Sequence, residues 1–283
     1  MKHIAKKSLG QNFLKSDSIL KKIVDAGEIK KEDIILEIGP GKGALTEKLL
    51  GCGCKVLAVE KDTELYEFLK TKFAEEILSG QFNLIYGDIL NFEILKNLKA
   101  LKISSGPRIS GSLSRPDHED ILDLSNSNYK IIANIPYNIT GAILKKFLTA
   151  EHQPESMVLM VQHEVAQRII ANDNKESILS ISVKAYGKPK MITKVDKRYF
   201  SPAPKVNSAV IKIAEINRKS FKDEKSESRF WEIVKNGFAH KRKKLSGNLK
   251  NIISTENAEF LKYKDKRAED LTLKEWIDLS NMV

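Results

Sequence analysis

Three short apolar runs alternate with two helical patterns early in the chain, and this alternation most strongly constrains the fold. The apolar runs cover residues 34–38, 55–60 and 83–86, and the helical patterns cover residues 44–50 and 63–78. Parallel strands that are covered on both faces read as continuous apolar runs, because neither face meets water. Runs of this kind in a β-α-β-α-β order predict a parallel, doubly wound α/β sheet.

The chain then extends this sheet. Further buried strands are predicted at residues 129–133 and 156–161, and a closing antiparallel pair at residues 190–197 and 206–213. Apolar stripes at helical spacing predict helices at residues 17–26, 141–150, 163–171 and 177–186. The sheet would thus be mostly parallel, with helices between its strands.

The composition changes after residue 216. Residues 217–229 are polar and charged, as in a linker, and helical patterns resume at residues 230–238, 245–253 and 273–282. We therefore expect one domain over residues 1–216 and a small helical domain over residues 217–283.

One segment does not fit the alternation. The connection from Asp88 to Asn134 is far longer than the handful of residues that usually joins two elements, and residues 104–117 within it are rich in Ser, Gly and Pro. We interpret residues 100–128 as a flexible insertion.

The charge of the chain points to a polyanionic partner. The formal net charge is +11, and phosphate contacts from Lys and Arg give affinity for nucleic acids without regard to sequence. The alternative is a merely basic enzyme.

No run is long and apolar enough for a membrane span, and no signal peptide is recognisable, so a cytoplasmic protein is expected. Cys52 and Cys54 lack the further ligands that a metal site needs, and we expect no metal.

The turn after the first strand indicates a cofactor site. Residues 37–43, Glu-Ile-Gly-Pro-Gly-Lys-Gly, have the spacing G-x-G-x-G at Gly39, Gly41 and Gly43, whereas a nicotinamide dinucleotide fingerprint has the spacing G-x-G-x-x-G. Glu60 and Asp88 end the next two strands, where carboxylates can accept hydrogen bonds from ribose hydroxyls and from an adenine amino group. This combination favours S-adenosylmethionine, with nicotinamide dinucleotide as the alternative.

The motif Asn134-Ile-Pro-Tyr137 follows the strand at residues 129–133. In open α/β sheets the ligand crevice lies outside the carboxyl ends of the strands. We predict that Asn134 and a backbone carbonyl near Ile135 or Pro136 hold the N6 amine of a flipped-out adenine. Tyr137 would stack on one face of the base and Phe200 on the other. The alternatives are a strand-end turn for the motif and a core position for Phe200.

Several motifs together carry a family resemblance. The chain resembles the small-subunit rRNA adenine-N6,N6-dimethyltransferases over nearly its whole length, through the motifs Leu9-Gly-Gln-Asn-Phe-Leu14, Glu37-Ile-Gly-Pro-Gly41, Asn134-Ile-Pro-Tyr137, Phe200-Ser-Pro-Ala-Pro-Lys-Val-Asn-Ser-Ala-Val210 and Phe238-Ala-His-Lys-Arg-Lys-Lys-Leu245. The resemblance implies a Rossmann-like class I methyltransferase with a seven-stranded sheet and a small helical domain. It implies dimethylation of two adjacent adenosines in a hairpin near the 3′ end of small-subunit rRNA, by an enzyme that we expect to be a monomer.

The resemblance also implies roles for single residues. Asn12 and Leu14 match family positions that line the cofactor, as do Gly39, Glu60, Asp88 and Asn134. Tyr137 and Phe200 match the aromatic pair that stacks on the target base.

The chain departs from the family in three places, and other functions stay open. Lys42 stands where many relatives carry Leu, a trait shared with the erythromycin-resistance rRNA methyltransferases. Residues 104–128 look inserted, and residues 175–178 lack a glycine that relatives often have. The alternatives are a large-subunit rRNA adenine methyltransferase of the resistance type, a DNA adenine methyltransferase, and a non-enzymatic assembly factor.

Overall fold

The computed structural model describes residues 4–91, 128–171, 173, 175–254 and 257–282. The expected insertion at residues 100–128 lies, except for residue 128, outside the described residues. Within them, no helix is long and apolar enough to cross a membrane.

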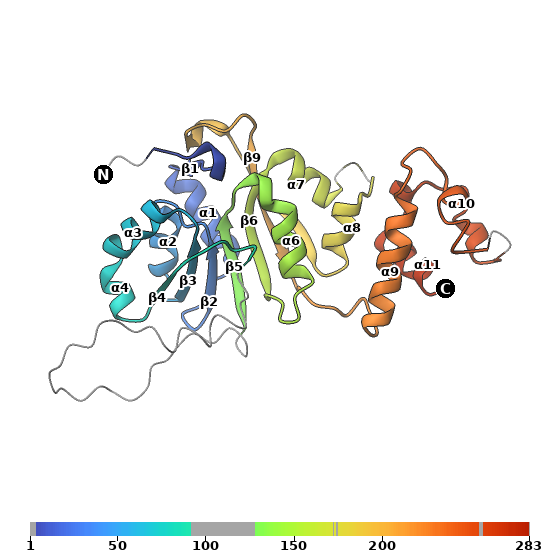
Figure 1. Ribbon diagram of the computed structural model, residues 1–283, viewed down its shortest axis with the longest axis horizontal. Coiled ribbons are helices and arrows are strands. Elements are labelled where there is room, and N and C mark those ends of the chain that lie inside the picture. Colours follow the sequence, from blue (N-terminus) through green and yellow to red (C-terminus); the bar gives the residue numbers. More distant parts are fainter. Residues whose placement is uncertain (1–3, 92–127, 172, 174, 255–256, 283) are drawn as a thin grey trace.

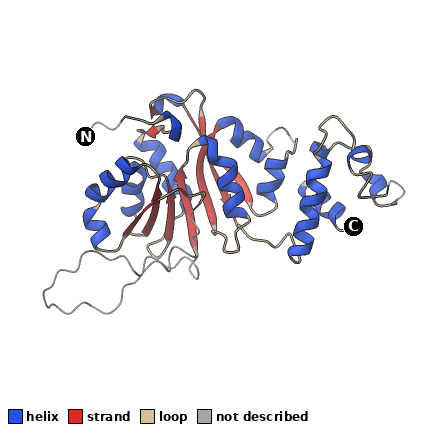
Figure 2. Ribbon diagram, in the orientation of Figure 1, coloured by secondary structure: helices blue, strands red, loops and turns tan. Residues whose placement is uncertain are grey.

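A seven-stranded sheet forms the centre of the molecule (Figures 1 and 2). Five neighbouring strands are parallel, and β9 runs antiparallel between β6 and the edge strand β7. The order across the sheet is β4 (Phe82–Tyr86), β3 (Lys55–Glu60), β2 (Ile34–Ile38), β5 (Tyr129–Asn134), β6 (Ser156–Gln162), β9 (Ser208–Ala214) and β7 (Lys188–Val195). The mostly parallel α/β fold is therefore confirmed.

Helices cover both faces of the sheet. Among the described residues, the α-helices that precede the C-terminal region are α1 (Asp17–Gly27), α2 (Ala44–Leu50), α3 (Thr63–Lys72), α4 (Ala74–Leu78), α6 (Thr140–Leu148), α7 (His163–Ile170) and α8 (Ile178–Lys184). The neighbouring residues Ile35 and Leu36 of β2 belong to two different apolar clusters, because successive side chains of a strand point to opposite faces. One cluster contains side chains of α1, α2 and α3, and the other contains side chains of α6, α7 and α8.

The prediction of a single helix over residues 63–78 was wrong, because the helix breaks at Phe73. Phe73 leaves helical geometry at φ −114° and ψ 36°, and its ring packs edge-on against Phe82 with 5.3 Å between centroids. The same ring lies where a side chain at Gly43 would have to go. Phe68 is 41% exposed, whereas Leu65 and Leu69 are buried.

The C-terminal region contains α9 (Glu224–Gly237), α10 (Leu245–Asn248) and α11 (Leu273–Ser280), which lie beyond α8 at one end of the molecule (Figure 1). The linker expected at residues 217–229 is helical from Glu224 onward. Asp223 caps this helix by accepting a hydrogen bond from the Ser226 backbone N–H at 2.7 Å, so the charged residues are its exposed face. The helix expected over residues 245–253 is only the short α10.

The C-terminal helices share an apolar core with the sheet. Phe230 and Trp276 belong to the same apolar cluster as Ile181 of α8. The indole of Trp231 on α9 also stacks on Tyr186, which follows α8, and donates a hydrogen bond to the Tyr186 hydroxyl at 3.0 Å. Packing and hydrogen bonding therefore fix the orientation of α9 on the sheet domain.

Candidate functional site

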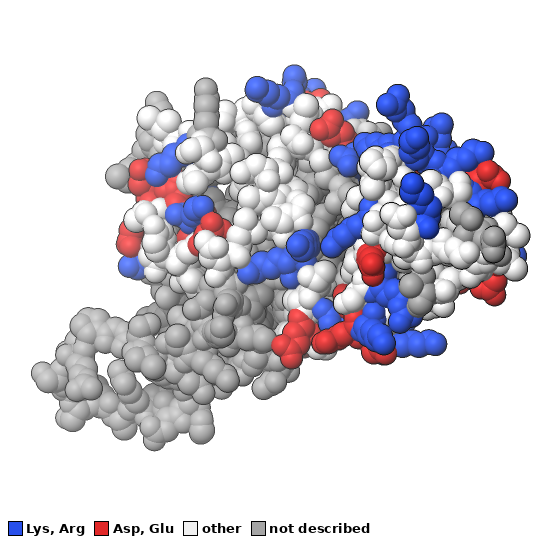
Figure 3. Space-filling model, turned by 45° about the vertical axis from the view of Figure 1, so that its right-hand side comes forward, with Lys and Arg blue, Asp and Glu red and all other residues white. Residues whose placement is uncertain are grey.

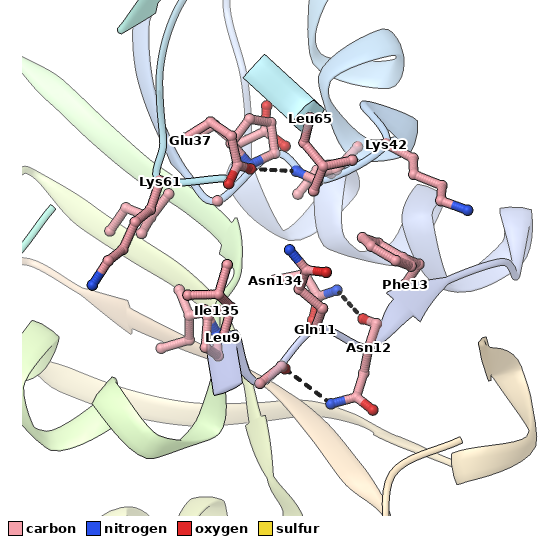
Figure 4. Close-up of a pocket in the computed structure, with 18 of the residues that line it drawn as sticks. Leu9, Gln11, Asn12, Phe13, Glu37, Lys42, Lys61, Leu65, Asn134 and Ile135 are labelled. Atoms are coloured by element: carbon pink, nitrogen blue, oxygen red, sulfur yellow. Dashed lines mark hydrogen bonds between the residues drawn. The ribbon is translucent and has the colours of Figure 1, made fainter. Parts of the chain in front are cut away.

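A cavity of about 460 Å³ opens at the carboxyl ends of β2, β3 and β5. Figure 4 shows side chains from several segments around it. Its walls come from an N-terminal arm (residues 6–15), the glycine turn (residues 37–45), the ends of β3 and β4, residues 134–139 and Ser201. The size is in the usual range for sites that bind small molecules and cofactors.

The glycine turn lets the backbone form the floor of the cavity. Gly39, Gly41 and Gly43 have φ angles of 65°, 60° and 74°, a region that L side chains rarely adopt. A side chain at Gly41 would also approach the ring of Phe13 to 3.1 Å. The turn therefore requires glycine, and it leaves Gly39 and Gly41 exposed to the cavity as cofactor-binding candidates.

Glu60 is the buried acid of the site. Its side chain accepts hydrogen bonds from the backbone N–H groups of Gly41 at 3.1 Å and of Asp62 at 2.8 Å. Burial raises the pKa of this carboxyl, and the two backbone donors oppose the rise. A carboxylate has about four acceptor positions, so two remain for the hydroxyl donors of a ligand.

Glu37 is a second buried carboxyl beneath the turn. The Thr46 hydroxyl donates a hydrogen bond to it at 2.7 Å, and burial raises its pKa to about 8, with a smaller contribution from the charge of Glu60. Glu37 is therefore protonated and neutral at pH 7. In this form it supports the turn without placing a second charge beside Glu60.

The raised pKa of Glu37 predicts a pH-dependent stability. An exposed glutamate has a pKa of about 4.3, so between about pH 5 and pH 8 the folded chain holds a proton that the unfolded chain has lost. Stability from this group therefore falls as pH rises through that window. We expect the melting temperature of the ligand-free wild type to fall over this window relative to that of Glu37→Gln, which does not titrate. Parallel melting curves for the two proteins would contradict the assignment.

Asp88 follows β4 and lines the same cavity. Its carboxylate pairs with the Lys61 ammonium at 2.8 Å and accepts a hydrogen bond from the Leu90 backbone N–H at 3.0 Å. The Lys61 ammonium holds the pKa of Asp88 below its usual range. The acid is thus charged and oriented, as an acceptor for an adenine amino group must be.

Asn134 ends β5 and presents an open acceptor. Its amide nitrogen donates a hydrogen bond to the Asn12 backbone carbonyl at 3.3 Å, as Figure 4 shows. No donor in the described part of the chain reaches its Oδ1 or the Ile135 carbonyl, whereas the Pro136 carbonyl accepts from Ile139 at 3.3 Å. Of the two backbone carbonyls predicted as candidates, that of Ile135 is the better acceptor.

The two predicted aromatic residues are placed differently. Tyr137 is half-buried, lines the cavity and shares a hydrogen bond between its hydroxyl and Ser208, and burial raises its pKa. Phe200 is 3% exposed and packs in the apolar cluster with Leu14 and Val195. The expectation that Phe200 forms a wall of the site does not match this structure.

Strand pairing explains the position of Phe200. The short strand β8 (Phe200–Ser201) pairs antiparallel with β1 (Phe13–Leu14), so that Leu14 lies opposite Phe200 and Phe13 opposite Ser201. Side chains alternate along a strand, and the pair Phe13 and Ser201 lines the cavity. Leu14, expected at the cofactor, is largely in the core and contributes only part of the lining.

Several residues of the arm contribute to the site although no sequence pattern singled them out. Phe13 lines the cavity beneath the Lys42 ammonium, which lies 4.9 Å from its ring centroid. Lys6 and Gln11 bind the buried carboxylate of Asp62. The only sequence signal for these residues was their place in or near the motif at residues 9–14.

Exposed cations gather over the C-terminal region (Figure 3). Lys241, Arg242 and Lys243, here called the 241–243 cluster, are exposed in the turn before α10. No carboxylate of the described residues pairs with them, whereas the neighbouring Lys244 pairs with Asp265 at 2.9 Å. The cluster is therefore available to an anionic partner.

Known proteins resemble this chain over its whole length. The family model described as ribosomal RNA adenine dimethylase matches residues 2–283. The chain belongs to the ribosomal RNA adenine dimethylase family. Two relatives are named ribosomal RNA small subunit methyltransferase A. The protein from Dehalococcoides mccartyi is 36% identical over 96% of this chain and 86% of its own length. The protein from Mycoplasma capricolum is 37% identical over 99% of this chain and 97% of its own length.

Solved structures confirm the fold. A dimethyladenosine transferase from Plasmodium falciparum matches with a TM-score of 0.71 and 24% identity over 94% of this chain and 95% of its own. The 23S rRNA methyltransferase ErmE matches with a TM-score of 0.72 and 21% identity over 96% of this chain and 99% of its own. At these identities the likeness concerns the Rossmann-like fold alone.

As a member of the dimethylase family, the chain is a methyltransferase that uses S-adenosylmethionine. The residues present fit this cofactor. The cavity combines a buried carboxylate with open acceptor positions, a glycine turn without side chains and a second oriented carboxylate. Glu60, Asp88, Gly39 and Gly41 would hold the nucleoside, while Asn12 and Asn134 close the far wall.

Proposed function

We propose that this enzyme dimethylates N6 of two adjacent adenosines in a hairpin near the 3′ end of small-subunit rRNA. Family membership and the small-subunit relatives support dimethylation of small-subunit rRNA adenine with S-adenosylmethionine. The observation that carries the proposal for this chain is the pair of open acceptors, Asn134 Oδ1 and the Ile135 carbonyl, at the end of β5 beside the cofactor cavity.

The acceptors match the chemistry of an adenine amine. The N6 lone pair is delocalised into the ring and is a poor nucleophile. Hydrogen bonds from the two N–H groups to Asn134 Oδ1 and the Ile135 carbonyl would hold the amine and favour a pyramidal nitrogen with its lone pair free. The bound cofactor supplies an electrophilic methyl group. The residues of the chain then act mainly by placing the nitrogen in line with it.

Proton transfer makes modest demands on the site. The amine becomes cationic when it accepts the methyl group, and it then loses a proton readily without a strong base. Tyr137 offers a ring face on which the base can stack, with its hydroxyl held by Ser208. We therefore assign Asn134, Ile135 and Tyr137 to the target base, with Pro136 fixing the backbone between them.

The two regions of the chain would divide the work. We assign residues 1–216 to methyl transfer and residues 217–283 to contacts with rRNA, because the 241–243 cluster, which pairs with no carboxylate of the described residues, suits phosphate groups. We further propose a monomeric, cytoplasmic enzyme that acts on immature small subunits.

Neutralising the 241–243 cluster should weaken rRNA binding. With all three residues changed to Gln, we expect the slope of log affinity against log salt to become shallower by about two to three units, because each phosphate contact contributes about 0.7 to 0.9 to that slope. Affinity for the cofactor should not change. The measurement is binding to small-subunit rRNA across a salt series.

A triple variant with the same loss of charge provides the control. The control changes three exposed lysines near the amino ends of β2 and β3, away from the cavity at the carboxyl ends: Lys30, Lys31 and Lys55. Their change to Gln should leave the salt slope near that of the wild type. Equal slopes for the two triple variants would refute a specific role for the cluster.

Removal of residues 104–126 should leave cofactor binding unchanged. The described residues that line the cavity lie between residues 8 and 90 or between 134 and 201. The dissociation constant of S-adenosylhomocysteine, measured by calorimetry, should equal that of the intact chain. A large loss of affinity would mean that the segment supports the site.

The proposed substrate is tested by offering several nucleic acids to the enzyme. Labelled S-adenosylmethionine is supplied with immature small subunits, naked large-subunit rRNA or DNA. The proposal requires label in the small subunits. Label only in large-subunit rRNA would support the resistance-type alternative, and label only in DNA would support a DNA adenine methyltransferase.

A further inference from the structure

The carboxylate of Asp62 holds two residues of the N-terminal arm. Its side chain is fully buried, and it accepts hydrogen bonds from the Lys6 ammonium at 2.8 Å and from the Gln11 amide at 2.7 Å. Gln11 in turn accepts a hydrogen bond from the Lys6 backbone N–H at 2.8 Å, and the Lys6 ammonium also pairs with Glu64 at 3.0 Å. These contacts tie both ends of the η1 segment (Lys7–Leu9) to one point.

That point is connected to the cofactor cavity. The Asp62 backbone N–H donates a hydrogen bond to Glu60 at 2.8 Å, and Glu60 also accepts from the Gly41 N–H in the glycine turn. Asp62 therefore lies between the arm on one side and the buried acid of the cavity on the other. It also caps α3 through the Glu64 N–H at 3.0 Å, which fixes its position.

The arm itself is a wall of the cavity. Residues 8–15 line it, and the arm is anchored at its far end by the pairing of β1 with β8 and by a hydrogen bond from Lys15 N–H to the Tyr199 carbonyl at 2.8 Å. Halfway along, Asn12 receives the hydrogen bond from Asn134. Among the described residues, the end near Lys6 and Gln11 is tied to Asp62 through side-chain contacts, so substitutions there can loosen the wall without changing the strand pairing at the other end.

We propose that Lys6 and Gln11 are positioning residues that fasten the arm over the bound methyl donor through Asp62. Charge-assisted hydrogen bonds are stronger than neutral ones, and a buried carboxylate gains most from them. The fastened arm would slow the exit of the cofactor and of its demethylated product. The residues touch neither reacting atom, so they set residence time and not the rate of the chemical step. The inference rests on the cavity being the cofactor site.

The test compares Lys6→Met, Gln11→Leu and the double variant with the wild type. For each, calorimetry gives the dissociation constant of S-adenosylhomocysteine, and stopped flow gives its dissociation rate. We expect affinity to fall roughly tenfold for each lost contact, through faster dissociation. The KM for S-adenosylmethionine should rise, while kcat at saturating cofactor is at least that of the wild type. Hydrogen exchange of a peptide covering residues 8–15 should be faster in the ligand-bound variants.

Lys70→Met is the matched control, because Lys70 lies on α3 in an exposed pair with Glu67 at 3.2 Å. It should match the wild type in every measurement. The proposed role of Lys6 and Gln11 is overturned if the variants bind and release S-adenosylhomocysteine like the wild type. It is also overturned if their ligand-free melting temperatures fall with kcat, since a general loss of structure would then explain the weaker binding. A wild type that does not bind the ligand would overturn the cofactor site itself.

Discussion

Replacement of Asn134 by Ala should slow methyl transfer to rRNA about 10²- to 10³-fold while the chain stays folded. The change removes one of the two open acceptors that we assign to the adenine amine, and it removes the hydrogen bond to the Asn12 carbonyl. Loss of one positioned hydrogen-bonding group in an active site costs about 10²- to 10³-fold in rate. Single-turnover methylation of small subunits at saturating cofactor measures this effect directly.

Two further variants show which atom of Asn134 matters. Asn134→Asp keeps an acceptor but loses the N–H donor to Asn12, so it should retain more activity than the alanine variant. Asn83→Ala removes an amide from β4, where the side chain bonds only the Gly80 carbonyl among the described residues, and it should be fully active. Near-normal turnover of Asn134→Ala would refute the role given to the amide.

Replacement of Glu60 by Gln should weaken cofactor binding about 100-fold, roughly 2.7 kcal/mol. Both oxygens of Glu60 accept from backbone N–H groups, so an amide in its place would set a donor against Gly41 or Asp62. A buried donor without an acceptor is costly, and the ribose would also lose an acceptor. Calorimetric titration with S-adenosylhomocysteine measures the loss.

The control for Glu60 is an acid in an exposed ion pair. Glu47→Gln on α2 removes the partner of Lys72, and its affinity should equal that of the wild type. The melting temperature of each ligand-free protein separates lost binding from lost folding. If Glu60→Gln bound the ligand as tightly as Glu47→Gln, the buried acid would not be a cofactor residue.

The sheet and the acids at its edge could be predicted because local patterns determine them. Buried parallel strands read as apolar runs, and the carboxyl ends of β2, β3 and β5 must meet at one edge. The order of strands along the chain therefore predicts that Glu60 and Asn134 lie together, and both residues line the cavity.

The remaining features depend on contacts between distant parts of the chain. The pairing of Leu14 with Phe200 decides that Phe200 is buried, and no local pattern near either residue indicates it. The contact between Gln11 and Asp62 likewise joins residues that are far apart in the sequence. The break at Phe73 depends on the space left by Gly43, and the helix start at Glu224 was hidden by a charged face that resembles a linker.

The most direct test of the proposed reaction is to locate the methyl groups. Small subunits lacking the modification are incubated with the enzyme and S-adenosylmethionine, and the rRNA is digested and analysed by mass spectrometry. We predict N6,N6-dimethyladenosine at two adjacent positions in a hairpin near the 3′ end, and at least 100-fold slower formation of it with the Asn134→Ala enzyme. Methylation elsewhere in the rRNA, or equal methylation by the Asn134→Ala enzyme, would contradict the proposed reaction.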